Sequence, residues 1–375
     1  MNRWREPAPG ERESGERSWP VVRAAFDERE PVVPRRDWRP VAVVAIAAAV
    51  VAAALSPPGL AVLDSLRDAV RGEENAKPAL FSLPATGRLL VNSAEGVWVV
   101  EHDGSKRLLA GYRDASWSPH GLYVAALHGH ELRAIEPNGD KHWSIARPDM
   151  TFPRWSKAGG GDERVAYISR GYLRVVGGDG KGDRALADAV APVAPAWKPA
   201  THILAFFDTR GRVRAMEVDS HRLLWTADVF ANRPVLLTWS DDGRRLVAAT
   251  ESELATFDAA GKPLTMTGLG GRPVAAAFAP RSHRFALLRR FNLDRRSGVE
   301  VIHSDQLNRR RRLFAGAGEF GGLAWSPNGR WIILDWDSAD QWLLIRSAAV
   351  RRVVAISNIA RNFGPHASLA GWCCP

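Results

Sequence analysis

The chain is poor in cysteine, with only two in 375 residues. So few thiols exclude a disulfide-stapled scaffold and a cysteine-rich zinc domain. The sequence also lacks a P-loop, a G-x-S-x-G nucleophile elbow, an H-E-x-x-H zinc motif and an EF-hand loop. We therefore predict no catalytic residue, no metal ligand and no cofactor site.

Long apolar runs are scarce as well, with one exception near the N-terminus. Residues 41–55 read VAVVAIAAAVVAAAL, and a second apolar stretch at 60–63 follows a Ser-Pro-Pro-Gly break. A bilayer span needs about 20 residues, so we predict an uncleaved transmembrane signal-anchor over 41–63. Two alternatives are a cleaved signal peptide, with 52–54 near the cleavage site, and a buried core helix. The 40 preceding residues are longer than a usual signal-peptide leader, which favours the anchor.

The flanks of this run predict its orientation. Residues 1–40 are charged and poor in apolar side chains, so we expect a mostly disordered tail. Basic residues are more frequent before the run than after it, which favours a cytoplasmic N-terminus. The basic residues compared are Arg23, Arg29, Arg35, Arg36 and Arg39 before the run, and Arg67, Arg71 and Lys77 after it. We predict a single-pass protein of the cell membrane, with a juxtamembrane helix and linker at 64–84 and an extracytoplasmic domain at 85–375.

The rest of the chain is a repeat. An aromatic residue, commonly followed by a Ser-Pro-x-Gly type of turn, recurs at intervals of 38 to 47 residues. The aromatics are Trp117, Trp155, Trp197, Trp239, Phe278, Trp325 and Trp372. Four short β-rich runs fit into each interval, and this period is typical of propeller blades. We predict an all-β, seven-bladed β-propeller in which each aromatic fills a blade interface.

These turns resemble the W-S-P-D-G signature of TolB-like or WD40-like propeller repeats, most clearly at 325–329 and 239–243. Asn328 and His120 depart from the signature Asp, and Phe278 replaces the Trp. The Trp-Asp dipeptide of WD40 repeats is absent at the blade ends, so the TolB-like variant fits better. The resemblance implies a bacterial envelope protein that serves as a protein-interaction platform, and it implies no particular ligand.

The first unit, 85–116, lacks an opening strand and aromatic of its own, whereas the chain stops soon after Trp372. We therefore expect residues 366–372 to complete that blade and close the ring, because closure removes exposed sheet edges. Cys373 and Cys374 are neighbours, and adjacent Cα atoms are closer than disulfide geometry usually requires. We expect free thiols or an intermolecular bridge there.

The chain has a net charge of +10, and its densest basic run is Arg309, Arg310, Arg311 and Arg312. A solvated outer strand explains this run, but it is also a candidate binding site for anionic lipid headgroups or wall polymers. Nucleic acid is not expected, because no basic groove interleaved with aromatics is present. His120, His128 and His130 form the closest histidine group, and solvated loop positions explain them better than a metal site does.

These observations favour a non-catalytic interaction or ligand-sensing module with an unknown protein or envelope partner. The alternative is a lactonase-like or hydrolytic propeller enzyme, in which polar groups from several blades would converge at the central channel. A third hypothesis makes the propeller an external sensor whose tail, 1–40, binds a cytoplasmic regulator.

Overall fold

The computed structural model describes residues 82–157, 162–291, 295–348 and 353–374. The predicted tail and signal-anchor, and nearly all of the predicted juxtamembrane segment, lie outside these residues. Within the part of the chain that is described, no helix is both long and apolar enough to cross a membrane.

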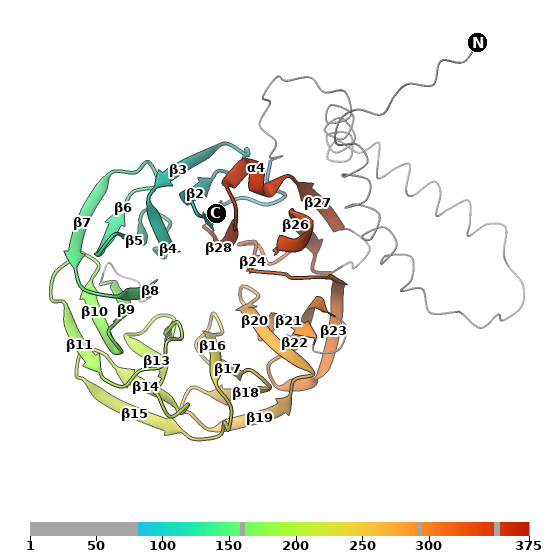
Figure 1. Ribbon diagram of the computed structural model, residues 1–375. Helices are drawn as coiled ribbons and strands as arrows, with labels where there is room; N and C mark the ends of the chain where they lie inside the picture. Colours follow the sequence, from blue (N-terminus) through green and yellow to red (C-terminus); the bar gives the residue numbers. More distant parts are fainter. Residues whose placement is uncertain (1–81, 158–161, 292–294, 349–352, 375) are drawn as a thin grey trace, which may run out of the picture.

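Seven four-stranded antiparallel sheets surround a central axis (Figure 1). The predicted all-β, seven-bladed propeller is therefore confirmed. From the axis outward, blade 1 contains β28 (Ser368–Cys373), β1 (Arg88–Asn92), β2 (Gly96–Val100) and β3 (Lys106–Ala110). Blade 2 contains β4 (Tyr112–Trp117), β5 (Val124–His128), β6 (Glu131–Ile135) and β7 (Lys141–Ala146). Blade 3 contains β8 (Met150–Trp155), β9 (Arg164–Ser169), β10 (Tyr172–Gly177) and β11 (Arg184–Ala187).

The other four blades follow the same order. Blade 4 contains β12 (Ala196–Trp197), β13 (Ile203–Phe207), β14 (Val213–Glu217) and β15 (Arg222–Ala227). Blade 5 contains β16 (Pro234–Trp239), β17 (Arg245–Thr250), β18 (Glu253–Asp258) and β19 (Pro263–Gly268). Blade 6 contains β20 (Gly271–Phe278), β21 (Arg284–Phe291), β22 (Arg296–His303) and β23 (Gln306–Ala317). Blade 7 contains β24 (Leu323–Trp325), β25 (Trp331–Trp336), β26 (Gln341–Arg346) and β27 (Val353–Ser357), with a 3-10 turn at Asp337–Ala339 and helix α4 (Ile359–Phe363).

The repeated turn is held by its serine. The buried Ser240 hydroxyl accepts the backbone N–H of Arg245 at 2.9 Å and donates to Asp242 at 2.6 Å. Ser326 makes the same two bonds, to Trp331 and Asn328, so Asn replaces Asp without loss of the turn. The glycine that ends the turn, such as Gly243, has φ near +65°, a conformation that favours glycine. This local geometry reverses the chain and starts the second strand of the blade.

The repeat aromatics lie on the innermost strands and pack against the preceding blade. Trp325 of blade 7 belongs to a core cluster with Ala286 and Val299 of blade 6, and the other aromatics occupy equivalent positions. The Trp325 indole N–H also donates to the carbonyl of Ala277 in blade 6, at 2.9 Å. Each blade interface thus combines one large apolar side chain with the sheet of its neighbour.

The ends of the ring meet in blade 1. Strand β28 pairs antiparallel with β1, with Trp372 opposite Leu89. A disulfide joins Cys373 to Cys374, so the expectation of free thiols or an intermolecular bridge is wrong. Side chains of neighbouring residues in a regular strand point to opposite faces. Cys374 breaks this alternation with a left-handed φ of 62°, which brings the two sulfur atoms together.

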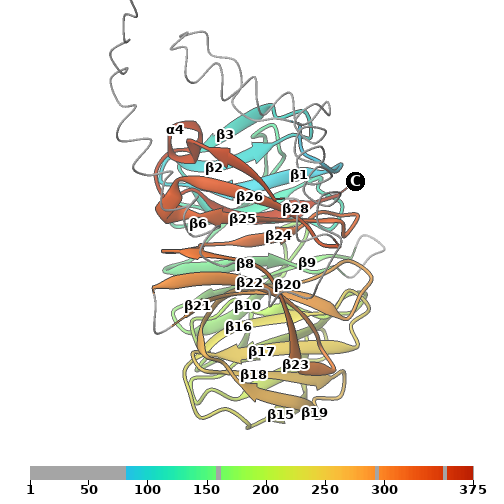
Figure 2. The same ribbon diagram turned by 90° about the vertical axis from the view of Figure 1, so that its right-hand side faces the viewer.

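The antiparallel order gives the ring two different faces, which Figure 2 shows edge-on. Face A carries the turns between the first and second strands and between the third and fourth strands of each blade. Face B carries the remaining turns and the connections between blades, including α4. The described chain enters at face A, where the Leu83 N–H donates to His102 in the β2–β3 turn at 2.7 Å.

Candidate functional site

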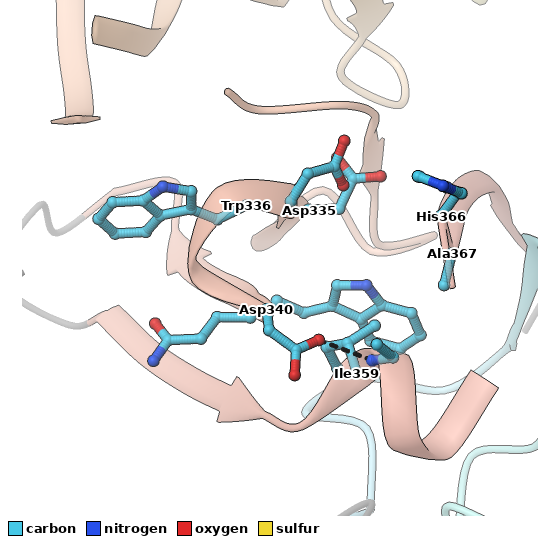
Figure 3. A pocket seen from close by; sticks show the side chains of 10 residues that line it. Asp335, Trp336, Asp340, Ile359, His366 and Ala367 are labelled. Carbon is cyan, nitrogen blue, oxygen red and sulfur yellow. Dashed lines mark hydrogen bonds between the residues drawn. The ribbon is translucent and has the colours of Figure 1, made fainter. Parts of the chain in front are cut away.

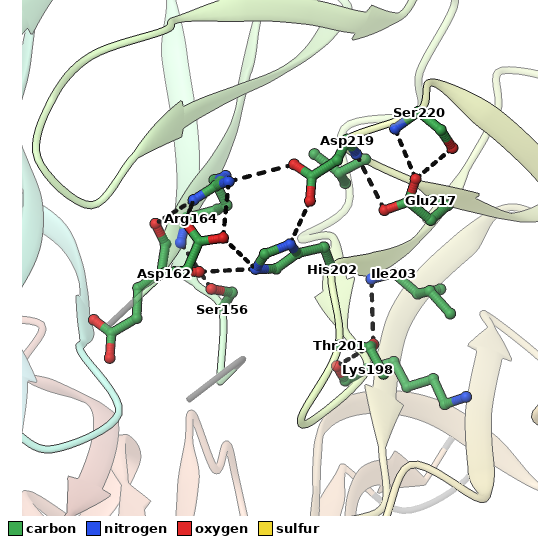
Figure 4. A network of polar contacts seen from close by, with 12 residues as sticks. Ser156, Asp162, Arg164, Lys198, Thr201, His202, Ile203, Glu217, Asp219 and Ser220 are labelled. Atoms are coloured by element: carbon green, nitrogen blue, oxygen red, sulfur yellow. Dashed lines mark hydrogen bonds and ion pairs between the residues drawn. The ribbon is translucent and has the colours of Figure 1, made fainter. Parts of the chain in front are cut away.

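Charges on face A between blades 3 and 4 are neutralised by a compact network (Figure 4). His202 of blade 4 lies between Asp219, at 2.5 Å from its Nδ1, and the Asp162 carbonyl of blade 3, at 2.8 Å from its Nε2. Arg164 forms ion pairs with both carboxylates, at 3.4 Å from Asp219. Arg164 is therefore paired with a carboxylate from each blade, and the network joins the two blades.

The carboxylates of this network remain ionised well below neutral pH. A hydrogen bond from Arg164 holds the pKa of Asp162 below its usual value. Burial alone would raise the pKa of Asp219, but hydrogen bonds and charges from His202 and Arg164 lower it overall. The network is an electrostatic clamp between the two blades.

Face A is different at blades 6 and 7, where arginines gather without carboxylate partners. We call Arg281, Arg284, Arg309, Arg330 and Arg346 the basic sector. The first four are exposed and Arg346 is partly buried. Within the described residues, none of the five forms an ion pair with a carboxylate. The basic sector is thus a region of unneutralised positive charge.

The predicted run of four arginines, Arg309 to Arg312, is only partly available to a ligand. Arg310 donates to the Gly268 carbonyl of blade 5 at 2.9 Å, and Arg311 donates to the Ser347 carbonyl of blade 7 at 2.5 Å. Arg312 lies over the Phe291 ring, 5.4 Å from its centroid. The run therefore holds blade 6 to both neighbours, and Arg309 is the member that belongs to the basic sector.

Arg284 and Arg330 were missing from the sequence prediction because they are far apart in the chain. Each follows a repeat turn and lies at or just before the start of a second strand. Aligning the repeats by their turns places Arg284 at the position of Arg245 in blade 5. Arg330 lies one residue earlier, at the position of Arg244. Whether such a charge is neutralised depends on residues in other turns: Arg245 is bonded to Asp305 at 2.6 Å.

Face B of blade 7 has the opposite character, with carboxylates around a cavity of about 80 Å³ (Figure 3). Its lining includes Asp335, Asp337, Asp340 and His366. Asp335 is buried, and it accepts the backbone N–H of Gly322 in blade 7 and that of Leu369 in blade 1, the latter at 3.1 Å. This carboxyl connects the last blade to the strand that closes the ring.

Burial raises the pKa of Asp335 to about 7, and the nearby charge of Asp337 acts in the same direction. The backbone N–H donors oppose this shift without cancelling it. Burial and the charge of Glu319 also raise the pKa of Asp337. Because Asp335 is fully engaged by backbone donors, its position indicates a structural clamp more than an acid or base.

The innermost strands carry little converging chemistry. Asp114 of blade 2 accepts the Phe152 N–H of blade 3 at 2.5 Å and lies 3.6 Å from Arg154. Across the described ranges, no three His, Cys, Asp or Glu side chains are grouped so that they could hold a metal ion. His128 and His130 flank the β5–β6 turn, where the Tyr112 ring packs against His128 at 4.9 Å.

The sequence matches no protein-family model and no curated protein. Its fold resembles many solved structures. One chain of the mitotic checkpoint complex is 15% identical with a TM-score of 0.54, and the match covers 73% of this chain and 96% of that one. Hsv2p from Kluyveromyces lactis is 8% identical with a TM-score of 0.54, over 69% of this chain and 89% of that one.

A chain of the hydrazine synthase of Kuenenia stuttgartiensis is 13% identical with a TM-score of 0.52, over 63% of this chain and 76% of that one. At such low identity these similarities show the fold alone. The molecule is a seven-bladed β-propeller, a fold that hosts many unrelated functions.

Proposed function

We propose that the protein is a membrane-anchored, extracytoplasmic β-propeller that acts as a non-catalytic protein-interaction module. The observation that carries this proposal is a pair of surfaces of opposite character. Face A of blades 6 and 7 carries the basic sector, whereas face B of blade 7 carries the cavity lined by Asp335, Asp337 and Asp340. Glu319, near that cavity, is paired with Arg290 of blade 6 at 2.9 Å.

A surface of unpaired like charges is unfavourable for an isolated molecule. Like charges that share a surface repel one another, and folding alone would be better served by alternating charges, as where Asp219 lies between Arg164 and His202. A partner of complementary charge offsets the repulsion, and charged surfaces speed the encounter with it. The closed ring supports this role because rigid blades hold their turns in fixed positions.

Two further facts support the proposal. The apolar run at 41–55 supplies a plausible membrane anchor. The described chain enters at face A, so an anchor that precedes it would leave face B open to a protein partner.

Site-specific photocrosslinking in cells that produce the full chain tests the proposal. A photoreactive residue at Ala360, which is exposed on α4 of face B, should give a discrete protein adduct. The same residue at the exposed Thr209, on face B of blade 4, is the matched control and should give no adduct. Adducts of equal yield and identity at both positions, or none at any exposed face-B position, would refute a specific protein-binding role.

A further inference from the structure

We propose that the basic sector on face A of blades 6 and 7 rests on anionic lipid headgroups of the membrane that anchors the chain. This inference depends on the proposed membrane anchor and adds a second contact to it. It identifies the bilayer surface, and not a nucleic acid, as the partner of the arginines.

Three arginines of the basic sector, Arg281, Arg330 and Arg346, lie on adjoining turns of blades 6 and 7. A Cβ built on Gly329 would lie 3.6 Å from Pro280, so the repeat turns that carry Arg330 and Arg281 are in contact. Ser347, next to Arg346, donates its backbone N–H to the carbonyl of Arg330 at 2.9 Å. Blades 6 and 7 thus present their guanidinium groups from adjoining turns.

The carboxylates beside the basic sector are engaged by other groups. Asp241 accepts the backbone N–H of Arg281 at 3.2 Å and lies 3.8 Å from Lys157. Asp242 is bonded to His283 at 2.8 Å, and Asp305 is bonded to Arg245 at 2.6 Å. The guanidinium groups of the basic sector are therefore left to bind other anions, and phosphate groups are among the anions that they bind with two parallel hydrogen bonds.

The entry point of the chain favours a membrane as the source of those phosphates. Leu83 is bonded to the β2–β3 turn on face A, and a Cβ on Gly87 would lie 3.1 Å from Pro327, in the repeat turn that leads to Arg330. The chain therefore joins the propeller beside the basic sector. Residues 64–81 separate the predicted span from the described domain, and 18 residues reach at most about 65 Å. A span at 41–63 thus allows face A to reach the bilayer surface.

Arginine-specific chemical modification of the full chain tests the proposal. The chain would be placed in nanodiscs of phosphatidylcholine alone, or of phosphatidylcholine with phosphatidylglycerol, treated with phenylglyoxal and analysed by mass spectrometry. At low salt we expect Arg284, Arg309 and Arg330 to react about fivefold more slowly in the anionic nanodiscs. This factor corresponds to the binding free energy of about 1 kcal/mol that one basic residue gains near an anionic surface. High salt should abolish the difference.

Matched variants control for indirect effects. Amide hydrogen exchange is the second measurement, and anionic nanodiscs should slow it in turns 280–284 and 326–330. The triple variant Arg284→Gln, Arg309→Gln and Arg330→Gln should abolish this slowing. The face-B substitutions Arg113→Gln, Arg233→Gln and Arg272→Gln remove the same charge from exposed positions and should leave that effect unchanged. Because all six side chains are exposed, both variants should fold.

The outcomes separate this inference from the proposed anchor. Equal modification in both nanodiscs, with the chain still embedded, would overturn the lipid contact and leave the anchor standing. A chain that does not associate with neutral nanodiscs would contradict the anchor itself. Protection by an added single-stranded oligonucleotide, without protection by anionic lipid, would show a nucleic-acid partner and would also overturn the proposal.

Discussion

Removal of the Trp372 side chain should weaken the ring at its closure. Trp372 is 8% exposed and packs between blades 7 and 1, in a cluster with Leu89, Ala324 and Trp342. Truncation of a buried Trp to Ala typically costs about 3–5 kcal/mol. In a domain of this size, that corresponds to a fall in the unfolding midpoint of roughly 6–20 °C.

Thermal unfolding of the full chain, followed by circular dichroism in detergent, measures the effect of Trp372→Ala. Trp372→Phe is the matched control because Phe278 fills the equivalent position in blade 6. Among the described residues the Trp372 indole N–H has no hydrogen-bond partner, so the Phe variant should lose less than about 1.5 kcal/mol. Leu122→Ala, at a side chain that is 63% exposed, should change little. An Ala variant that melts with the wild type would refute the role of Trp372 as an interface wedge.

Three further substitutions test other parts of the account. Glu300→Gln should lower the free energy of unfolding in urea by about 3–5 kcal/mol, because it leaves the buried Arg289 charge without its partner. A loss below about 1 kcal/mol would contradict the importance of this ion pair. The pKa of Asp335 is raised to about 7 in the folded protein, whereas an unfolded Asp has a pKa near 3.9. Protonated Asp335 therefore contributes most to stability below about pH 4, and this contribution is lost as the pH rises to about 7. Asp335→Asn should therefore flatten the dependence of unfolding free energy on pH across this interval, which urea titrations at several pH values would show; an unchanged slope would argue against the shift. Ser240→Ala removes the acceptor of the Arg245 N–H and should cost about 1 kcal/mol by the same assay, and no loss would mean that the turn does not need its serine.

The number of blades could be predicted from the sequence because each blade needs one aromatic residue at the same position. The intervals between Trp117 and Trp372 therefore count the blades directly. The missing first strand of 85–116 also gave a physical reason to place the C-terminal segment in blade 1, where β28 lies. These features depend on local periodicity and on the need to pair sheet edges.

The electrostatic features could not be predicted in the same way, because they depend on contacts between turns of different blades. The run at Arg309 to Arg312 was visible in the sequence. The sequence did not show that Arg310 and Arg311 bind carbonyl groups of the neighbouring blades whereas Arg309 is exposed. Arg330 lies outside that run and was not identified as a candidate from the sequence. The clamp at Asp335 also requires the ring to be closed, since one of its donors, Leu369, lies 34 residues away in blade 1.

Protease accessibility in intact spheroplasts tests the central claim, an extracytoplasmic propeller on a membrane anchor, most directly. If the claim is correct, added protease should remove the propeller at 85–375 and leave a membrane-bound fragment that contains residues 1–40. A propeller that survives the protease and stays membrane-bound, but is digested once the membrane is permeabilised, would place it in the cytoplasm and contradict the account.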